Sequence, residues 1–173
     1  MNILTSYVID AERKIVSVGG AWEQFSDENG GQNLSLADIK DKSIFDFVVG
    51  DSSRLWLDSL IRMALESKEP VQRPYRCDSP DTRRYMLMTI VPEESGLLTV
   101  QHALVAQEAR SPRVSITRQE QTATREPSLQ CTVCGKIKSG DYWVEADEAT
   151  EVSELHLTVM NAICDQCGKD VSA

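Results

Sequence analysis

Two nearly identical cysteine turns carry the most specific chemistry in this sequence. The hexapeptide CTVCGK occupies residues 131–136, and CDQCGK occupies residues 164–169. Two residues between cysteines allow a tight turn to direct both sulfurs at one point, and two such turns supply the four sulfurs of a tetrahedral metal site. The predicted metal ligands are Cys131, Cys134, Cys164 and Cys167.

Zinc is the metal that this pattern favours, because two Cys-x-x-Cys pairs are typical of structural zinc sites. Four protein sulfurs leave no coordination position for water, so we expect a structural role and no hydrolysis. Two alternatives stay open, namely iron in an iron–sulfur cluster and a thiol redox pair. A glycine directly follows each cysteine pair, at Gly135 and Gly168, where it can adopt positive φ and let the chain leave the turn.

The composition favours a globular protein in a reducing compartment. The 173 residues are 41% hydrophobic and 26% charged, and the net charge of −9 disfavours nucleic acid as a partner. No apolar run approaches the roughly 20 residues of a membrane span, and the N-terminus does not read as a signal peptide. We therefore expect a cytoplasmic protein without a membrane segment, in which clustered cysteines bind metal before they form disulfides.

Composition divides the chain into three segments. Residues 1–108 predict one domain, and residues 129–173 predict a four-cysteine module. Between them, residues 109–128 hold four arginines, two glutamates and two prolines but few apolar residues, which indicates a linker with a short strand at RVSIT. In the module, the 29 residues between the two turns leave room for a small hairpin at 136–145 and a helix at 145–157.

The first segment predicts two strands, then helices, then three strands. Residues 7–9 and 15–18 form the expected opening hairpin, and a short helical stretch follows. A longer helix is expected to begin near Asp51 and to end before Pro70. Its apolar positions have helical spacing, at Leu57, Leu60, Ile61, Ala64 and Leu65. Three strand-like runs come next, at 71–77, 83–91 and 96–106.

This order of elements resembles the PAS domain over roughly residues 3–108. The local pieces that carry the resemblance are IVSVGGAW at 15–22, with Gly19 where the PAS pattern has Asn, and FDFVVGDSSRLWLDSLIRMAL at 45–65. The tail is similar to those of bacterial PAS-type regulatory proteins of unassigned role, with CTVCGK, YWVE and AICDQC in the same order. Asn161 stands where similar tails often have His.

The resemblance implies an α+β protein: a PAS-like five-stranded antiparallel sheet with a helical crossover, plus a small zinc-ribbon or treble-clef-like module. It also implies a pocket between sheet and helices that can hold a small ligand, and a sheet face used for homodimerisation.

Three further side chains each allow a functional interpretation and a purely structural one. Cys77 fits a redox sensor if its thiol is exposed, and otherwise a small buried side chain. His102, with Met86 or Met88, fits the axial ligands of a haem, and otherwise the core. His156 fits a competing zinc ligand, and otherwise the surface of a helix.

The function that these features favour is that of a non-enzymatic sensory or regulatory protein in signal transduction. No arrangement of a nucleophile and a base is recognisable in the sequence, so we expect no enzyme. The protein is expected to act through a protein partner or a small ligand. Two alternatives are a thiol-based redox sensor or oxidoreductase that uses the Cys-x-x-Cys pairs, and a structural adaptor with no ligand.

Overall fold

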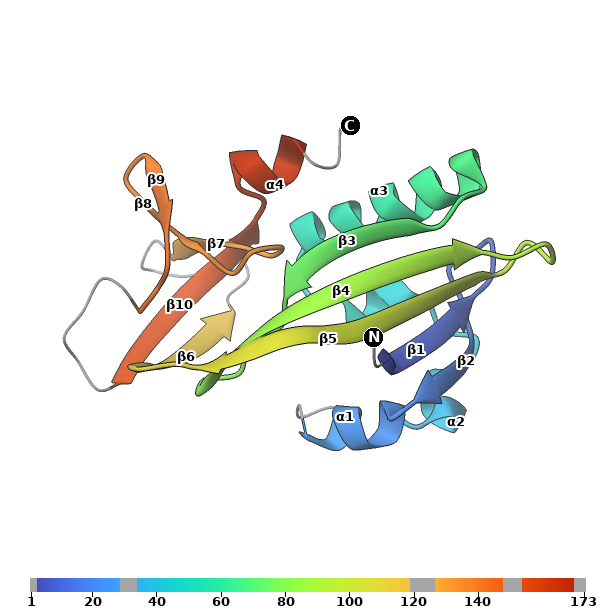
Figure 1. Ribbon diagram of the computed structural model, residues 1–173, viewed down its shortest axis with the longest axis horizontal. Helices are drawn as coiled ribbons and strands as arrows, with labels where there is room; N and C mark the ends of the chain where they lie inside the picture. The colour runs from blue at the N-terminus through green and yellow to red at the C-terminus, as the bar shows by residue number, and fades with distance from the viewer. Residues whose placement is uncertain (1–2, 29–33, 119–126, 148–153, 170–173) are drawn as a thin grey trace. The chain divides into compact units, whose positions relative to one another are not determined.

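The computed structural model describes residues 3–28, 34–118, 127–147 and 154–169 (Figure 1). Backbone contacts divide the chain into two compact units, each of which is discontinuous in sequence. Unit 1 comprises residues 1–49, 57–74 and 86–105. Unit 2 comprises residues 50–56, 75–85 and 106–173. These bounds differ from the predicted segments, because two short pieces from the first 108 residues cluster with the cysteine-rich tail.

The first sheet has five strands in the order β2-β1-β5-β4-β3 (Figure 1). Strand β1 pairs antiparallel with both β2 and β5, and β5 is the central strand of the sheet. All five strands were predicted at these places in the sequence. Their bounds are β1 Ile3–Ile9, β2 Ile15–Gly20, β3 Val71–Arg76, β4 Thr82–Pro92 and β5 Leu98–Ala109.

Helices fill the connection between β2 and β3. They are α1 (Trp22–Glu28), α2 (Leu36–Ile39), the 3-10 helix η1 (Ile44–Phe47) and α3 (Asp51–Ser67). The expected long helix is confirmed, and its apolar face is buried at Leu57, Leu60, Ile61 and Ala64. In β4, alternate residues Met86, Met88 and Ile90 are buried in turn. These two faces supply much of the apolar core of unit 1.

The second sheet belongs to unit 2 and has the order β6-β10-β7-β8-β9. Strand β10 is parallel to both of its neighbours, β6 and β7, whereas β7, β8 and β9 pair antiparallel. The bounds are β6 Arg113–Arg118, β7 Ser128–Cys131, β8 Ile137–Ser139, β9 Tyr142–Val144 and β10 Glu154–Ala162. The core of this unit is small and centres on Val114, Ile137, Ala146 and Val159.

Two expectations for the tail are corrected here. The helix predicted at 145–157 is wrong where the chain is described, because β9 is followed by non-helical residues up to Asp147 and residues from 154 onward form strand β10. Leu155, Leu157 and Val159 pack on one side at every second position, which is the period of a strand. The part of that prediction at 148–153 lies outside the described residues.

The segment predicted as a linker, 109–128, contains strand β6 of the second sheet. Val114 is buried and Ile116 packs against the same core, so this strand contributes to unit 2. The expected short strand at RVSIT is confirmed, together with the hairpin at 136–145, which is β8–β9. The fold class is therefore α+β, with one antiparallel-type and one mixed sheet.

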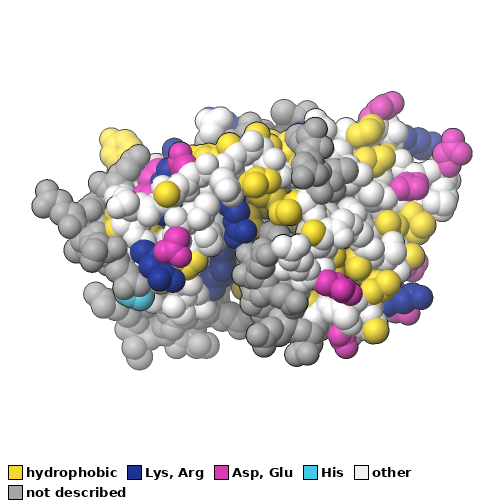
Figure 2. Space-filling view, turned by 60° about the horizontal axis from the view of Figure 1, so that its bottom comes forward, with side chains coloured by type: hydrophobic (Ala, Val, Ile, Leu, Met, Phe, Trp, Pro, Cys, Tyr) yellow, Lys and Arg dark blue, Asp and Glu magenta, His cyan; other side chains and the backbone are white. Residues whose placement is uncertain are grey.

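Among the described residues, no helix is both long enough and apolar enough to cross a membrane. On the face drawn in Figure 2, basic and acidic side chains of the described residues are interspersed, and neither sign forms a broad patch.

Replacing Leu60 with Ala tests the assignment of the buried face of α3. Leu60 is fully buried, so Leu60→Ala is expected to lower the free energy of unfolding of unit 1 by about 2–5 kcal/mol. Arg62→Ala is the matched control on the same helix, because it removes only a mostly exposed ion pair with Asp58, worth up to about 1 kcal/mol. Urea unfolding followed by circular dichroism measures both. Equal losses in the two variants would contradict the assignment.

Candidate metal centre

The first cysteine turn lies between β7 and β8. The Cys131 amide donates to the Lys136 carbonyl at 2.8 Å, and the Gly135 amide donates to the Cys131 carbonyl at 2.9 Å. Gly135 has φ of +74°, as expected for a glycine that lets the chain leave such a turn. These bonds close the loop and bring the Cys131 and Cys134 side chains to one side of it.

The second turn joins the end of β10 to the short helix α4 (Asp165–Lys169). The Thr132 amide donates to the Ala162 carbonyl at 2.9 Å, which holds the two turns side by side. Gly168 does not adopt positive φ, contrary to its expected role, because it lies within α4 and donates its amide to the Cys164 carbonyl at 2.9 Å. The two similar hexapeptides thus fold differently.

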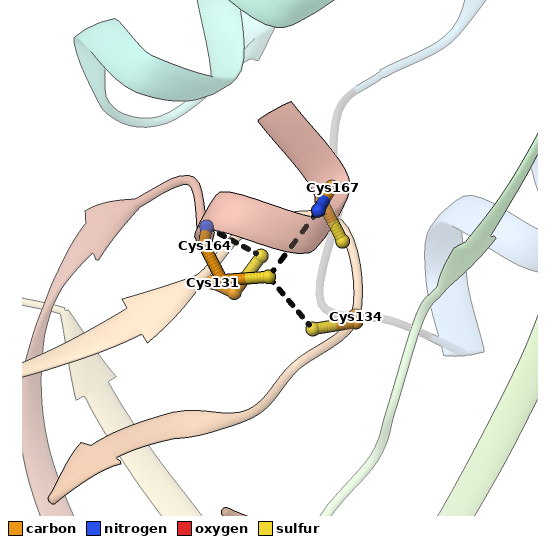
Figure 3. A group of neighbouring side chains, drawn as sticks. All are labelled: Cys131, Cys134, Cys164 and Cys167. Carbon is orange, nitrogen blue, oxygen red and sulfur yellow. Dashed lines mark hydrogen bonds between the residues drawn. The ribbon is translucent and has the colours of Figure 1, made fainter. Parts of the chain in front are cut away.

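All four cysteine sulfurs converge in one place, as Figure 3 shows. The Sγ atoms lie within 4.8 Å of one another, and those of Cys134 and Cys164 are 3.8 Å apart. A regular tetrahedron with metal–sulfur bonds of ~2.3 Å places its sulfurs about 3.8 Å apart. The cluster therefore has the size to hold a single metal ion, and the four residues predicted from the sequence are the ones that meet.

Backbone amides already point at these sulfurs. The Cys164 amide donates to Cys131 Sγ at 3.4 Å, and the Cys167 amide donates to Cys164 Sγ at 3.5 Å (Figure 3). Such N–H···S bonds stabilise negative charge on thiolates, which is the form of cysteine that binds metals. Cys131 and Cys164 are buried, whereas Cys134 and Cys167 are partly exposed.

The thiols of the cluster shift one another's pKa values. A hydrogen bond from the Cys134 thiol lowers the pKa of Cys131, and the same bond raises the pKa of Cys134. Burial raises the pKa of Cys167. Four thiolates this close together repel one another, so they cannot all be ionised unless a cation replaces the shared protons.

His156 does not join this cluster. It lies on β10 with an exposed side chain, and the group of potential ligands found within the described residues consists of the four cysteines. The expectation that placed it on a helix is wrong, but its interpretation as a surface residue stands.

Cys77 lies in unit 2 and His102 in unit 1, and neither belongs to the group of potential metal ligands found in the described chain. Cys77 follows β3 and is partly buried, and burial raises the pKa of its thiol, which opposes the reactive thiolate of a redox sensor. The His102 ring lies on β5 with its centroid 5.6 Å from that of Tyr7. Burial lowers the pKa of His102 to about 4, so this imidazole is neutral near pH 7.

Unit 2 also contains an ion-pair network that sequence reasoning did not find. Arg76 donates to both oxygens of Glu145 at 2.7–2.8 Å and also pairs with Asp78. Arg83 makes two bonds of 2.7–2.8 Å to Asp147. Glu145 is 69 residues from Arg76, and Asp147 is 64 residues from Arg83, so no local sequence pattern could have joined these pairs. The polar run DSPDTRR at 78–84 carries part of this network, through Asp78 and Arg83.

Asn161, the residue that stands in place of His, takes part in a polar cluster with the first turn of α3. The Asn161 side-chain amide donates to Ser53 Oγ at 3.3 Å, and the Asn161 backbone carbonyl accepts a hydrogen bond from Ser52 Oγ at 3.2 Å. Ser53 Oγ in turn lies 2.6 Å from Thr132 Oγ1. Thr132 belongs to the first cysteine turn, so residues 50–56 are bonded to both arms of the metal centre.

No protein-family model matches the chain, and a search of curated proteins found no significant match.

The positive φ of Gly135 leads to a direct test. Gly135→Ala is expected to destabilise unit 2 and to weaken metal binding, because it strains the backbone by about 1–2 kcal/mol and brings a Cβ within 3.3 Å of the Arg76 guanidinium. Gly140→Ala is the control, since Gly140 has φ of +57° with open space around it. Thermal unfolding and competition with a zinc chelator measure both effects. A weaker effect at Gly135 than at Gly140 would refute this account of the turn.

The low pKa of His102 predicts a pH dependence of stability. The imidazole is held neutral in the fold, whereas in the unfolded chain it takes up a proton near pH 6.5. Unit 1 is therefore expected to keep full stability above pH 6.5 and to lose roughly 1–3 kcal/mol as the pH falls towards 4.

Urea unfolding between pH 4.5 and 8 checks this dependence. The variant His102→Gln should show a smaller loss at low pH than the unmodified chain. His156→Gln, at an exposed position, should retain the original profile. An unchanged profile in His102→Gln would assign the pH dependence to other groups.

Proposed function

We propose that Cys131, Cys134, Cys164 and Cys167 hold one structural zinc ion. The observation that carries this proposal is the convergence of four sulfurs within 4.8 Å. This spacing suits one ion better than a polynuclear iron–sulfur cluster, whose several iron atoms require its cysteines to stand farther apart. When bound, zinc would neutralise the four thiolates and cross-link the two turns, with no coordination position left for a substrate.

The elements that carry the ligands favour the treble-clef alternative over the zinc ribbon. One pair comes from a tight turn between strands, and the other begins just before a helix. A hairpin, β8–β9, lies between them in sequence. We infer a treble-clef-like module that has been extended by the parallel strands β6 and β10.

Zinc would supply much of the stability that unit 2 lacks. Within the described residues, the apolar cluster around Val114 has four buried members and three partly buried neighbours, which is a small core for five strands. Metal binding contributes about 10–16 kcal/mol in small zinc modules, a free energy that couples folding to the ion. The role of the metal would therefore be to hold a binding surface in shape.

For the whole chain we propose a non-enzymatic regulatory protein with a PAS-like sensory or interaction domain in unit 1. Support comes from the order of elements: two strands, short helices, the long helix α3 and three strands. The five strands lie in one sheet with the helices in the crossover between β2 and β3. Such a domain would act by binding a protein partner or a small ligand, with the zinc module as a second unit of the same chain.

Metal analysis of the purified full chain tests the zinc proposal. We expect one zinc per chain by inductively coupled plasma mass spectrometry, and a protein without visible colour. Cys131→Ser should lose most of the zinc and lower the thermal stability of unit 2. Cys77→Ser is the control, because Cys77 lies outside the cluster and should leave the zinc content unchanged.

Three outcomes would contradict the proposal. Stoichiometric iron with visible absorption would reassign the site to iron chemistry. A folded chain without metal, whose four thiols are oxidised and reduced reversibly, would favour the thiol redox alternative. Equal zinc contents in Cys131→Ser and the unmodified chain would place the metal elsewhere.

A further inference from the structure

Unit 2 contains a cavity that the zinc site does not explain. Its volume is about 300 Å³, at the lower end of the range for small-molecule sites. All of its lining residues belong to unit 2. They come from the β3–β4 turn, from Arg110 and β6, from the first cysteine turn and from the end of β10.

Positive charge predominates on the cavity wall. Three arginines line it, Arg76, Arg110 and Arg118, against the single carboxylate of Asp78. Arg76 is already neutralised by Asp78 and Glu145. Arg110 shares Asp78 with Arg76, at the longer distance of 3.5 Å, so one carboxylate on the wall faces two arginines, and Arg118 adds a third positive charge.

Arg110 is a buried cation with unused hydrogen-bonding capacity. Its side chain is only 2% exposed, and its contacts with Asp78 and Asp147 are long, at 3.5 and 3.8 Å. Among the described residues its buried Nε has no hydrogen-bond partner. A buried donor without an acceptor costs about 1–3 kcal/mol, a cost that an acceptor supplied by a ligand would remove.

Arg118 supplies a further positive charge at the cavity. It lies at the end of β6 with an exposed side chain and has no ion-pair partner within the part of the chain that the structure describes. Its positive charge acts on the Cys77 thiol, which also lines the cavity. Arginines favour carboxylates because their planar N–H groups match the two carboxylate oxygens.

The rest of the wall is apolar on one side. Val114 and Ile116 of β6 line it together with Pro80, and Val114 is buried. A short carbon chain would add apolar contacts to the parts of Pro80 and Ile116 that face the cavity, whereas a bare inorganic anion would make none. The wall therefore has one part suited to a negative group and another suited to hydrocarbon.

We propose that this cavity binds a small organic carboxylate, with its carboxylate group at Arg110 and Arg118 and its carbon chain against Val114 and Ile116. Cys131, Thr132 and Gly135 of the first cysteine turn also line the cavity. An occupant would thus lie against the metal-binding turn and would stabilise the metal-bound form of unit 2 by mass action. This site goes beyond the function proposed above, which assigns no ligand to the zinc-bearing unit.

Alkylation of Cys77 reports whether the cavity is occupied. The zinc-loaded full chain is treated with iodoacetamide, and modification of Cys77 is followed by peptide mass spectrometry. The probe is hexanoate, with Kd measured by calorimetry. At ten times Kd, the alkylation rate of Cys77 is expected to fall about tenfold, because only about one cavity in eleven remains empty. Hexanamide, which has the same chain without the charge, should give little protection, and so should inorganic phosphate.

A matched pair of variants on β6 tests the role of the arginine. Arg118→Gln is expected to weaken hexanoate binding about tenfold or more, since it removes a charge-assisted bond at the cavity. Arg113→Gln makes the same change on the same strand, but Arg113 pairs with Asp81 and does not line the cavity. It should bind hexanoate as the unmodified chain does. Both positions are exposed, so both variants are expected to fold.

Several results would overturn the proposal. These are no protection of Cys77 at any hexanoate concentration up to 50 mM or so, equal protection by hexanamide or phosphate, and equal Kd values in the two variants. The test is separate from that of the zinc site. A chain that carries iron and still binds hexanoate through Arg118 would contradict the metal assignment alone, whereas a zinc-loaded chain that ignores hexanoate would contradict this inference alone.

Discussion

Convergence of four sulfurs is the constraint on which the second unit depends. The two cysteine turns meet because β7 and β10 run parallel and adjacent, with Cys131 opposite Ala162 in the register. Parallel neighbours need a crossover of a dozen or more residues, since the chain must return to its starting end before it forms the second strand. The long interval between the cysteine pairs, which exceeds the commonest zinc spacing, is therefore a consequence of strand direction. The hairpin β8–β9 forms within that return path.

The sequence was most informative where local spacing alone determines the outcome. The cysteine ligands follow from two short motifs, and α3 follows from the helical spacing of Leu57, Leu60 and Ile61. It was least informative in β10. There, helix-forming residues in 145–157 suggested a helix, while the alternation of Leu155, Leu157 and Val159 indicated a strand. Tertiary packing favours the strand, because these three side chains complete the small core around Val114.

The ion-pair network illustrates a second limit. Arg76 and Arg83 lie close together in sequence, in a stretch that reads as a polar turn, yet their carboxylate partners Glu145 and Asp147 come from beyond β9. Charges with exposed side chains contribute little to stability, but those of Arg76 and Glu145 are largely buried, so each depends on the presence of the other. Sequence alone gives no sign of this dependence, because it arises only when the β3–β4 segment and the C-terminal tail come together in the fold.

Because the second unit is discontinuous in sequence, it is difficult for recombination to transfer it as one piece. Residues 50–56 and 75–85 lie in the middle of the first domain's sequence but cluster with the tail. A recombination event that joined the tail to another protein at residue 109 would leave Arg76 behind while it carried Glu145 away, and buried charges would be stranded on both fragments. The tail is therefore not expected to be exchanged between proteins as an independent zinc-binding module. The two parts are expected to change together, with substitutions in the β3–β4 turn matched by substitutions in the tail.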